Sequence, residues 1–340
     1  MLDTLKTLCY LSGVSGFEDE VRDYILERVM PFSDSILTDA MGNLIVTKKG
    51  KKASSEKVLL CAHMDEVGLI VTGIDDDGYL RFDFIGGIDR RVIIGKRIYI
   101  GRDRIPGIIG IKAYHLVDDE EEKKVPKRED MYIDIGVSTK KDAEELVCLG
   151  DAGVFADSVI EFGNGFLKAK AIDDRAGCAA LIKLIESDLP CDCTFAFTVQ
   201  EEVGLRGAKI AAARVNPDIA IVLEGTTAAD LPEVSEGKRI CKLGDGLVIP
   251  FMDRGTIYSR NLYERVTKIA DANGIKWQTK TLIAGGTDAA AIQRSGSGVD
   301  TIAISTPIRN IHSPASTAKL EDFEQMPRLA MLLLESIAES

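Results

Sequence analysis

Histidine is scarce in this sequence: three of its 340 residues are histidine, at positions 63, 115 and 312. The seven cysteines include no Cys-x-x-Cys pair, and Cys191 and Cys193 come nearest to one. We therefore expect reduced structural thiols rather than a disulfide framework. No long apolar run is present, so we predict neither a signal peptide nor a membrane span. We accordingly expect a cytoplasmic location and no membrane partner.

Positive charge is also in short supply. Lysine and arginine number 42 against 54 aspartates and glutamates, which gives a formal net charge of −12. Nucleic-acid binding needs a basic face, so this balance argues against nucleic acid as a main partner.

Strands and helices alternate in most of the chain. The first 30 residues have helical periodicity with a break at 12–16, and strands are expected at 43–47 and 57–61. Beyond residue 168 we predict helices at 175–186, 208–214, 261–273, 289–294 and 321–339, and strands at 194–199, 219–223, 276–282 and 301–305. This alternation predicts an α/β fold with a mostly parallel central sheet flanked by helices.

A different texture runs from about residue 68 to residue 163. Short β-rich segments alternate there with glycine turns, and 141–149 is the one helical stretch, which is typical of a small β-barrel. The charged run 118–130 within it is expected to be a solvated, mobile loop. The predicted domains are thus a catalytic α/β domain, 1–67 and 164–340, split by an inserted β-barrel, 68–163.

His63 follows an apolar strand, and Asp65 follows it by two residues. In extended backbone, residues i and i+2 share a face, so the Asp65 side chain is placed to orient the imidazole. The pattern is weak alone, because a single histidine at a strand end is more often structural.

Acidic residues and another histidine recur after other apolar segments. Two adjacent aspartates, Asp173 and Asp174, precede a predicted helix, and an N-cap role explains Asp174 but not both. Glu201 and Glu202 follow one strand and Glu224 ends another, while His312 lies in the loop after the 301–305 strand. Each has a plain structural explanation, but the carboxyl ends of parallel strands gather at one edge of a sheet.

So many carboxylates at one edge require counter-charge. Asp173, Glu202 and Glu224 contribute three negative charges, and two neutral histidines contribute none. Two divalent cations would leave a net charge of +1, which suits a bridging hydroxide. Nitrogen and oxygen ligands without sulfur fit zinc or cobalt, with manganese as a further candidate.

Together these motifs resemble those of the tetrahedral-particle aminopeptidases, which include glutamyl and deblocking aminopeptidases and some members labelled endoglucanases. The resemblance runs almost end to end and is carried by the segments 14–18, 39–44, 62–68, 170–177, 200–207, 285–289 and 309–313. It implies that Asp173 bridges two metal ions. His63 and Glu224 would complete one site, and Glu202 and His312 the other.

The resemblance also assigns catalytic roles: Glu201 is the implied general base, and Asp65 orients His63. It implies a cis peptide bond between Asp173 and Asp174. One position departs from the pattern, because Glu224 is an aspartate in many relatives; this puts the metal preference in doubt.

By the same resemblance, the inserted barrel is a dimerisation domain, and dimers would assemble into a hollow dodecamer. His115 lies in this block and is read as structural or oligomeric. The expected substrates are short peptides with a free N-terminus. Loops carrying Thr226, Thr227 and Thr287 are expected to line the pocket, without revealing which N-terminal residue is preferred.

Three other functions fit parts of the pattern. Paired carboxylates also hydrolyse glycosidic bonds, although that chemistry needs no imidazole ligands. An acylase or deacetylase would use the same metals and differ only in the pocket beyond them. A shell-forming protein with a degenerate site is disfavoured because all five expected ligands are present.

Overall fold

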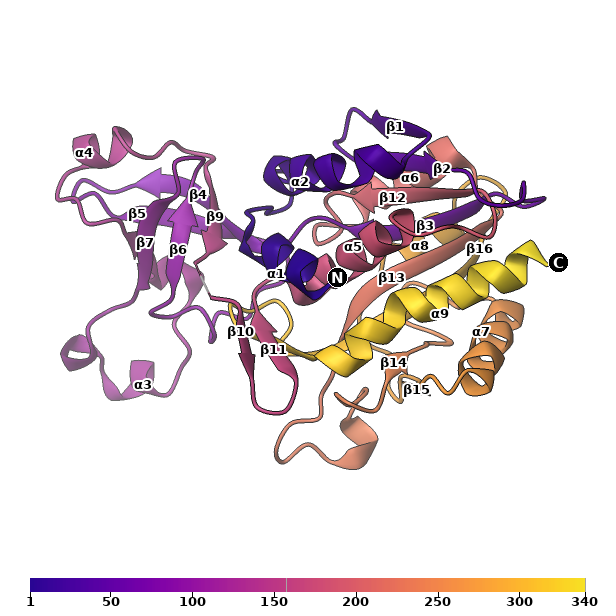
Figure 1. Cartoon of the computed structure of the whole chain (residues 1–340). Helices are drawn as coiled ribbons and strands as arrows, with labels where there is room; N and C mark the ends of the chain where they lie inside the picture. Colours follow the sequence, from indigo (N-terminus) through magenta and orange to yellow (C-terminus); the bar gives the residue numbers. More distant parts are fainter. Residues whose placement is uncertain (157, 340) are drawn as a thin grey trace.

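The computed structural model describes residues 1–156 and 158–339. An eleven-stranded sheet runs through the larger part of the molecule (Figure 1). Its four central strands are parallel, as predicted, in the order β12 (Cys193–Thr198), β3 (Val58–His63), β13 (Ile219–Thr227) and β16 (Asp300–Arg309). All four are built largely from buried β-branched, aliphatic and aromatic residues, as expected for strands covered on both faces.

Antiparallel strands extend this core on both sides. Strand β2 (Leu44–Lys48) pairs with β12, and β1 (Ser35–Thr38) pairs with β2. Beyond β16 come β17 (Ser316–Lys319), β11 (Phe166–Ala169) and β10 (Ile160–Phe162). Strand β14 (Leu247–Val248) pairs with β16 and with β15 (Trp277–Gln278). We predicted a strand at 276–282, but the strand found there, β15, is only two residues long. It pairs with β14, which is equally short.

Helices cover both faces of the sheet. On one face lie α5 (Ile172–Ile185) and α9 (Leu320–Ala338), with α1 (Leu2–Tyr10) and α2 (Asp19–Val29) packed on α5. Helices α6 (Arg206–Val215) and α8 (Ala289–Gln293) cover the other face, and α7 (Arg260–Ala272) packs against α9 (Figure 1). The predicted helices are confirmed, with ends shifted by a few residues. None of the described helices is both long and apolar enough to span a membrane.

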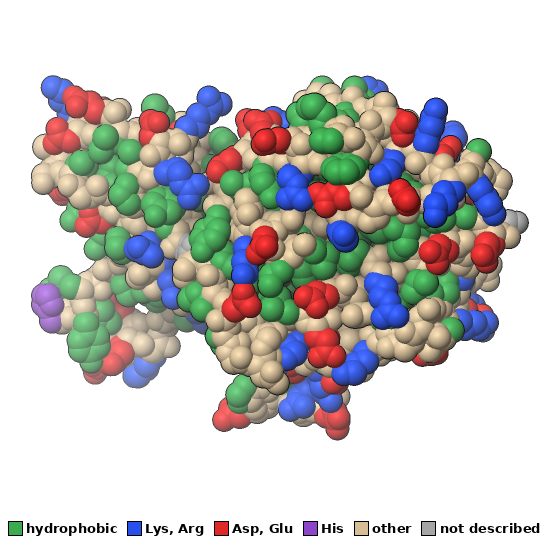
Figure 2. Space-filling view, viewed as in Figure 1, with side chains coloured by type: hydrophobic (Ala, Val, Ile, Leu, Met, Phe, Trp, Pro, Cys, Tyr) green, Lys and Arg blue, Asp and Glu red, His purple; other side chains and the backbone are tan. Residues whose placement is uncertain are grey.

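A closed six-stranded barrel forms the smaller part, as predicted. Its strands are β4 (Gly68–Ile74), β5 (Leu80–Ile85), β8 (Tyr132–Asp134), β7 (Ile105–Gly110), β6 (Arg97–Ile100) and β9 (Ala152–Phe155), in that order around the barrel. It has its own apolar core, which includes Leu69, Phe82 and Ile98. Acidic, basic and apolar side chains are interspersed over one face of both parts (Figure 2).

The charged run 118–130 is exposed, as expected, but it is not a structureless loop. It contains α3 (Asp119–Glu122), whose start is fixed by reciprocal hydrogen bonds between Asp118 and Glu121, and a 3-10 turn at Arg128–Asp130. Helix α4 (Lys140–Glu144) is shorter than the predicted 141–149. Other 3-10 turns lie at Met30–Phe32, Tyr114–Leu116 and Glu236–Lys238. His115 lies in the second of these, exposed on the barrel.

Candidate metal centre

His63 ends the central strand β3 and is 1% exposed. Its Nε2 lies 3.1 Å from Glu224 Oε1 and 3.6 Å from Asp173 Oδ1. Glu224 belongs to the neighbouring strand β13, so two adjacent parallel strands deliver these two side chains to one point. The structure thus brings together the three residues expected around one ion.

His312 occupies the corresponding place on the other side of Asp173. Its Nε2 lies 3.1 Å from Glu202 Oε1 and 3.6 Å from Asp173 Oδ2. Its other ring nitrogen, Nδ1, lies 2.9 Å from the backbone carbonyl oxygen of Gly87, a residue just beyond barrel strand β5. The side chain of His312 is 31% exposed, so this half of the centre faces solvent more than the His63 half does.

Asp173 therefore lies between the two imidazoles, with one carboxylate oxygen toward each. Its peptide bond to Asp174 is cis, as the resemblance implies. Asp174 accepts the backbone N–H of Gly177 at 2.8 Å, which is the capping interaction expected of it, and the N–H of His63 at 3.2 Å. The two adjacent aspartates thus have different surroundings.

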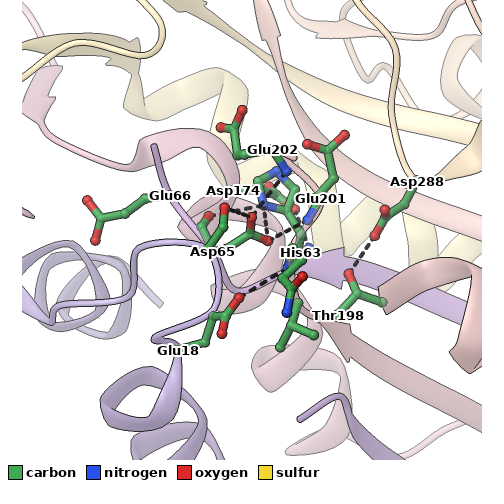
Figure 3. Close-up of polar contacts among 12 residues, drawn as sticks. Glu18, His63, Asp65, Glu66, Asp174, Thr198, Glu201, Glu202 and Asp288 are labelled. Carbon is green, nitrogen blue, oxygen red and sulfur yellow. Dashed lines mark hydrogen bonds and ion pairs between the residues drawn. The ribbon is translucent and has the colours of Figure 1, made fainter. Parts of the chain in front are cut away.

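Asp65 has more contacts than the His63–Asp65 spacing alone predicted. His63 Nδ1 lies 3.1 Å from the backbone oxygen of Asp65 and 3.4 Å from its carboxylate. The carboxylate accepts the backbone N–H groups of Glu201 at 2.9 Å and Glu202 at 3.1 Å, and the Ser15 hydroxyl at 2.6 Å. One side chain therefore fixes the loop that carries both glutamates as well as facing the histidine (Figure 3).

The carboxylates of Glu201 and Glu202 point apart (Figure 3), and none of the described residues donates a hydrogen bond to the Glu201 carboxylate. Burial raises its pKa well above the ordinary value, although the charge of His63 opposes the shift. A partly buried carboxylate that accepts no hydrogen bond is suited to accept and release a proton.

The charges of the cluster perturb one another strongly. Burial disfavours the charged form of His312, but Asp173 and Glu202 outweigh it and raise its pKa to about 11. The pKa of His63 is also raised well above its usual value, with Glu224 the main opposing influence to burial. Burial raises the pKa of Glu224 to about 8. The clustered carboxylates thus stabilise positive charge at this place, whether on a histidine or on a bound cation.

The donor set fits divalent cations. Asp173 Oδ1 and Glu224 Oε2 are buried and have no hydrogen-bond partner among residues 1–156 and 158–339. His63, Asp173 and Glu202, and also His63, Asp174 and Glu224, offer ligand atoms within 4.8 Å of one another. The nitrogen-to-oxygen distances of 3.1 and 3.6 Å bracket the spacing of about 3.4 Å between two ligands that are each about 2.1 Å from a tetrahedral zinc ion.

Two acidic groups near the centre lie in segments that carry the resemblance, but the sequence assigned neither of them a role. Glu66 is buried and accepts hydrogen bonds from Lys170 Nζ at 2.6 Å and an Arg175 guanidinium nitrogen at 3.1 Å. Asp288, in the 285–289 segment, is fully buried against Thr198 and Cys61. Only the motif segments signalled these residues, because the partners of each are about 90 or more positions away along the chain.

Relatives of known sequence span nearly the whole chain. A protein of Acetivibrio thermocellus, provisionally named an aminopeptidase, is 39% identical over 99% of this chain and 98% of its own. A lysyl aminopeptidase of Pyrococcus furiosus is 30% identical over 98% of this chain and 97% of its own. A glutamyl aminopeptidase of Lactococcus lactis is 31% identical over 99% of this chain and 96% of its own.

Solved structures agree with this likeness. A TET aminopeptidase of the archaeon Thaumarchaeota archaeon SCGC AB-539-E09 superposes with a TM-score of 0.94 at 34% identity, covering 99% of this chain and 98% of that one. A TET1 peptidase of Pyrococcus horikoshii, which can assemble into a tetrahedron or a large octahedral shell, gives 0.85 at 37%, covering 98% of each. A Thermotoga maritima protein named an endoglucanase gives 0.81 at 37%, covering 98% of each.

Residues 42–329 also match the sequence profile of the M42 glutamyl aminopeptidases. That span holds the paired histidines, the carboxylate between them and the glutamate loop described above. The resemblance seen in the motifs is confirmed, and the chain belongs to the M42 glutamyl aminopeptidase family of peptide hydrolases.

Proposed function

We propose that this protein is a dinuclear metallo-aminopeptidase that removes N-terminal residues from short peptides. The observation that carries the proposal is Asp173, whose two oxygens each lie 3.6 Å from a different histidine. His63 and Glu224 would hold one ion, and Glu202 and His312 the other. Zinc or cobalt suits these ligands best, with manganese as an alternative.

Divalent ions bound there would polarise the scissile carbonyl and acidify a water molecule. The residues of the chain provide the rest of the reaction. Glu201 takes a proton from the attacking water and returns it to the leaving nitrogen. Asp65 keeps Glu201 in position through its backbone N–H, and keeps the His63 ring facing the centre.

The decisive experiment uses aminoacyl p-nitroanilides. Activity should vanish on treatment with EDTA and return on addition of zinc, cobalt or manganese, and a peptide with a blocked N-terminus should resist cleavage. If no metal restores turnover, the proposal fails. Faster cleavage of N-acetyl amino acids would favour an acylase, and metal-independent cleavage of cellulose would favour a glycosidase.

We also propose that the barrel, residues 68–163, pairs two subunits, that the catalytic domain comprises 1–67 and 164–340, and that dimers build a larger cytoplasmic shell. The support is the likeness to the TET1 peptidase that assembles into a tetrahedron or an octahedral shell. Light scattering of the native protein tests this: a monomer at micromolar concentration would contradict it.

A further inference from the structure

The segment 39–44 carries part of the family resemblance, yet the proposed reaction gives it no role. It forms the turn between β1 and β2, and Asn43 at its end is fully buried. One carboxylate oxygen of Asp39 accepts three backbone N–H groups of this turn, at 2.9 to 3.0 Å, and the other accepts the Asn43 side-chain amide at 2.7 Å. The side chain of Asn43 is therefore held in one orientation.

Asn43 bonds both ends of the loop that carries Glu201 and Glu202. This glutamate loop runs from Val199, just after β12, to Gly207 in the first turn of α6. The amide oxygen of Asn43 accepts the backbone N–H of Val199 at 3.0 Å, and its amide nitrogen donates to the backbone carbonyl of Gly207 at 3.1 Å. The Gly207 N–H also donates to the Val199 carbonyl at 3.0 Å. One side chain thus closes the base of the loop.

The fit at this base leaves no room for a side chain at position 207. A Cβ there would lie 2.3 Å from the Val199 carbonyl oxygen and 2.4 Å from the Asn43 amide oxygen. Only glycine permits so close an approach of two backbone segments. The position of Asn43 and that of the loop ends are therefore tightly linked.

The backbone of the glutamate loop needs external contacts to keep its shape. Gln200 and Leu205 have φ of +56° and +57°, in the left-handed region that residues other than glycine rarely adopt. Such conformations persist only where the surrounding structure fixes them. Asp65 fixes the middle of the loop through the backbone N–H groups of both glutamates, and Asn43 fixes its two ends.

We propose that Asn43 is a positioning residue for the reaction, which holds the glutamate loop in the conformation that lets Glu201 reach the attacking water. The inference rests on the proposed aminopeptidase function. Asn43 bonds the backbone of Val199 and Gly207, so it acts on Glu201 through the chain. Proton transfer needs a base within hydrogen-bond reach, and a displacement of about 1 Å can lower a rate by about 100-fold.

A double-mutant cycle with Glu201 provides the main test. With metals restored, Asn43→Ala should lower kcat by about 10- to 100-fold and change KM by less than about threefold, because the geometry of proton transfer is altered and substrate binding is not. In a Glu201→Gln background the same substitution should lower the residual rate by less than about twofold, since the group that Asn43 positions is already absent.

The outcomes separate this inference from the function on which it rests. Equal losses in the two backgrounds, or a kcat that Asn43→Ala leaves unchanged, would overturn the positioning role. Absence of turnover by the wild type with every metal would instead overturn the proposed function.

Exchanging two side chains separates the loop contact from the turn that supports it. Asp39→Asn combined with Asn43→Asp reverses their hydrogen bond and keeps acceptors for the turn and for Val199, but it removes the donor to Gly207. This variant should fold and still lose about fivefold or more in kcat, the range for one hydrogen bond. It therefore decides the question even where Asn43→Ala does not fold. Wild-type kcat in the exchanged variant would contradict the proposal.

Asn216→Ala is the matched control. Asn216 is an exposed asparagine that ends the same helix, α6, with φ +49°, at the end opposite to the glutamate loop. Alanine tolerates this conformation poorly, so the melting temperature should fall, while kcat stays within about twofold of the wild type. A loss of kcat as large as that of Asn43→Ala would show that loosening α6 anywhere slows the reaction, and would overturn a specific role for Asn43.

Discussion

The two histidines of the candidate metal centre are held in opposite ways. His63 is buried at the end of a central strand and is oriented by Asp65, two residues away. His312 is partly exposed, and its ring nitrogen contacts the carbonyl of Gly87, 225 residues away on the inserted barrel. The ring of His63 is thus held by a near neighbour in the sequence, whereas the position of the His312 ring depends on how the barrel meets the α/β part. We therefore expect the two metal sites to differ in affinity.

Removing Glu201 tests what both halves have in common. Glu201→Gln should lower kcat by about 10³-fold or more, because it removes the proton carrier, yet leave both metals bound. Kinetics and metal analysis on the same preparation measure this. Near-normal turnover would show that another group carries the proton.

The histidines themselves provide the most direct comparison. His63→Ala leaves buried carboxylates without their partner and should destabilise the protein by about 3–5 kcal/mol. His312→Ala should cost less than about 1 kcal/mol, since this side chain is partly exposed, and should lower the metal content by one ion. Thermal unfolding and mass-spectrometric metal counts distinguish the two variants. Equal effects on both measures would contradict the proposed asymmetry.

Glu18 gives the surroundings of the glutamate loop a pH dependence. It is buried and accepts the backbone N–H groups of Gly16 at 2.8 Å and Gln200 at 3.1 Å. Burial raises its pKa from 4.5 to about 7. Between these values the folded state binds more protons than the unfolded state, so this group lowers the free energy of unfolding as pH rises.

Glu18→Gln keeps both acceptor contacts and removes the ionisation. The variant should match the wild type near pH 4 and exceed its stability by about 3 kcal/mol at pH 8. Urea unfolding of both proteins at the two pH values measures this. Identical pH dependence in the two would show that Glu18 titrates normally.

The weakest expected effect concerns the distant half. Gly86 has φ +81°, and a Cβ there would meet Val67 at 2.7 Å, so Gly86→Ala should displace the adjacent Gly87 carbonyl. Metal affinity on the His312 side should fall about 10-fold with the His63 side unchanged, because an outer hydrogen bond is lost. Gly136→Ala is the control, since it has φ +79° and an unobstructed Cβ position. Equal metal affinities in the two variants would show that the barrel does not help to position His312.

The same contrast explains what the sequence could predict. The α/β alternation, the barrel and the pairing of His63 with Asp65 follow from local periodicity, which the sequence displays directly. The Gly87 contact is made by a backbone atom, for which no residue type is a signal. Asn43 and Glu66 are buried polar residues that bond to distant segments, and the short strands β10, β11 and β17 form by pairing rather than by a strong pattern of their own.

The spread of the proposed ligands along the chain has a consequence for biosynthesis. Asp173 is flanked by partners that lie as early as residue 63 and as late as residue 312. A nascent chain therefore lacks one proposed ligand, His312, until residue 312 has left the ribosome and β16 has joined the sheet. The peptide-hydrolysing centre proposed above would therefore be inert while the polypeptide that bears it is still being made.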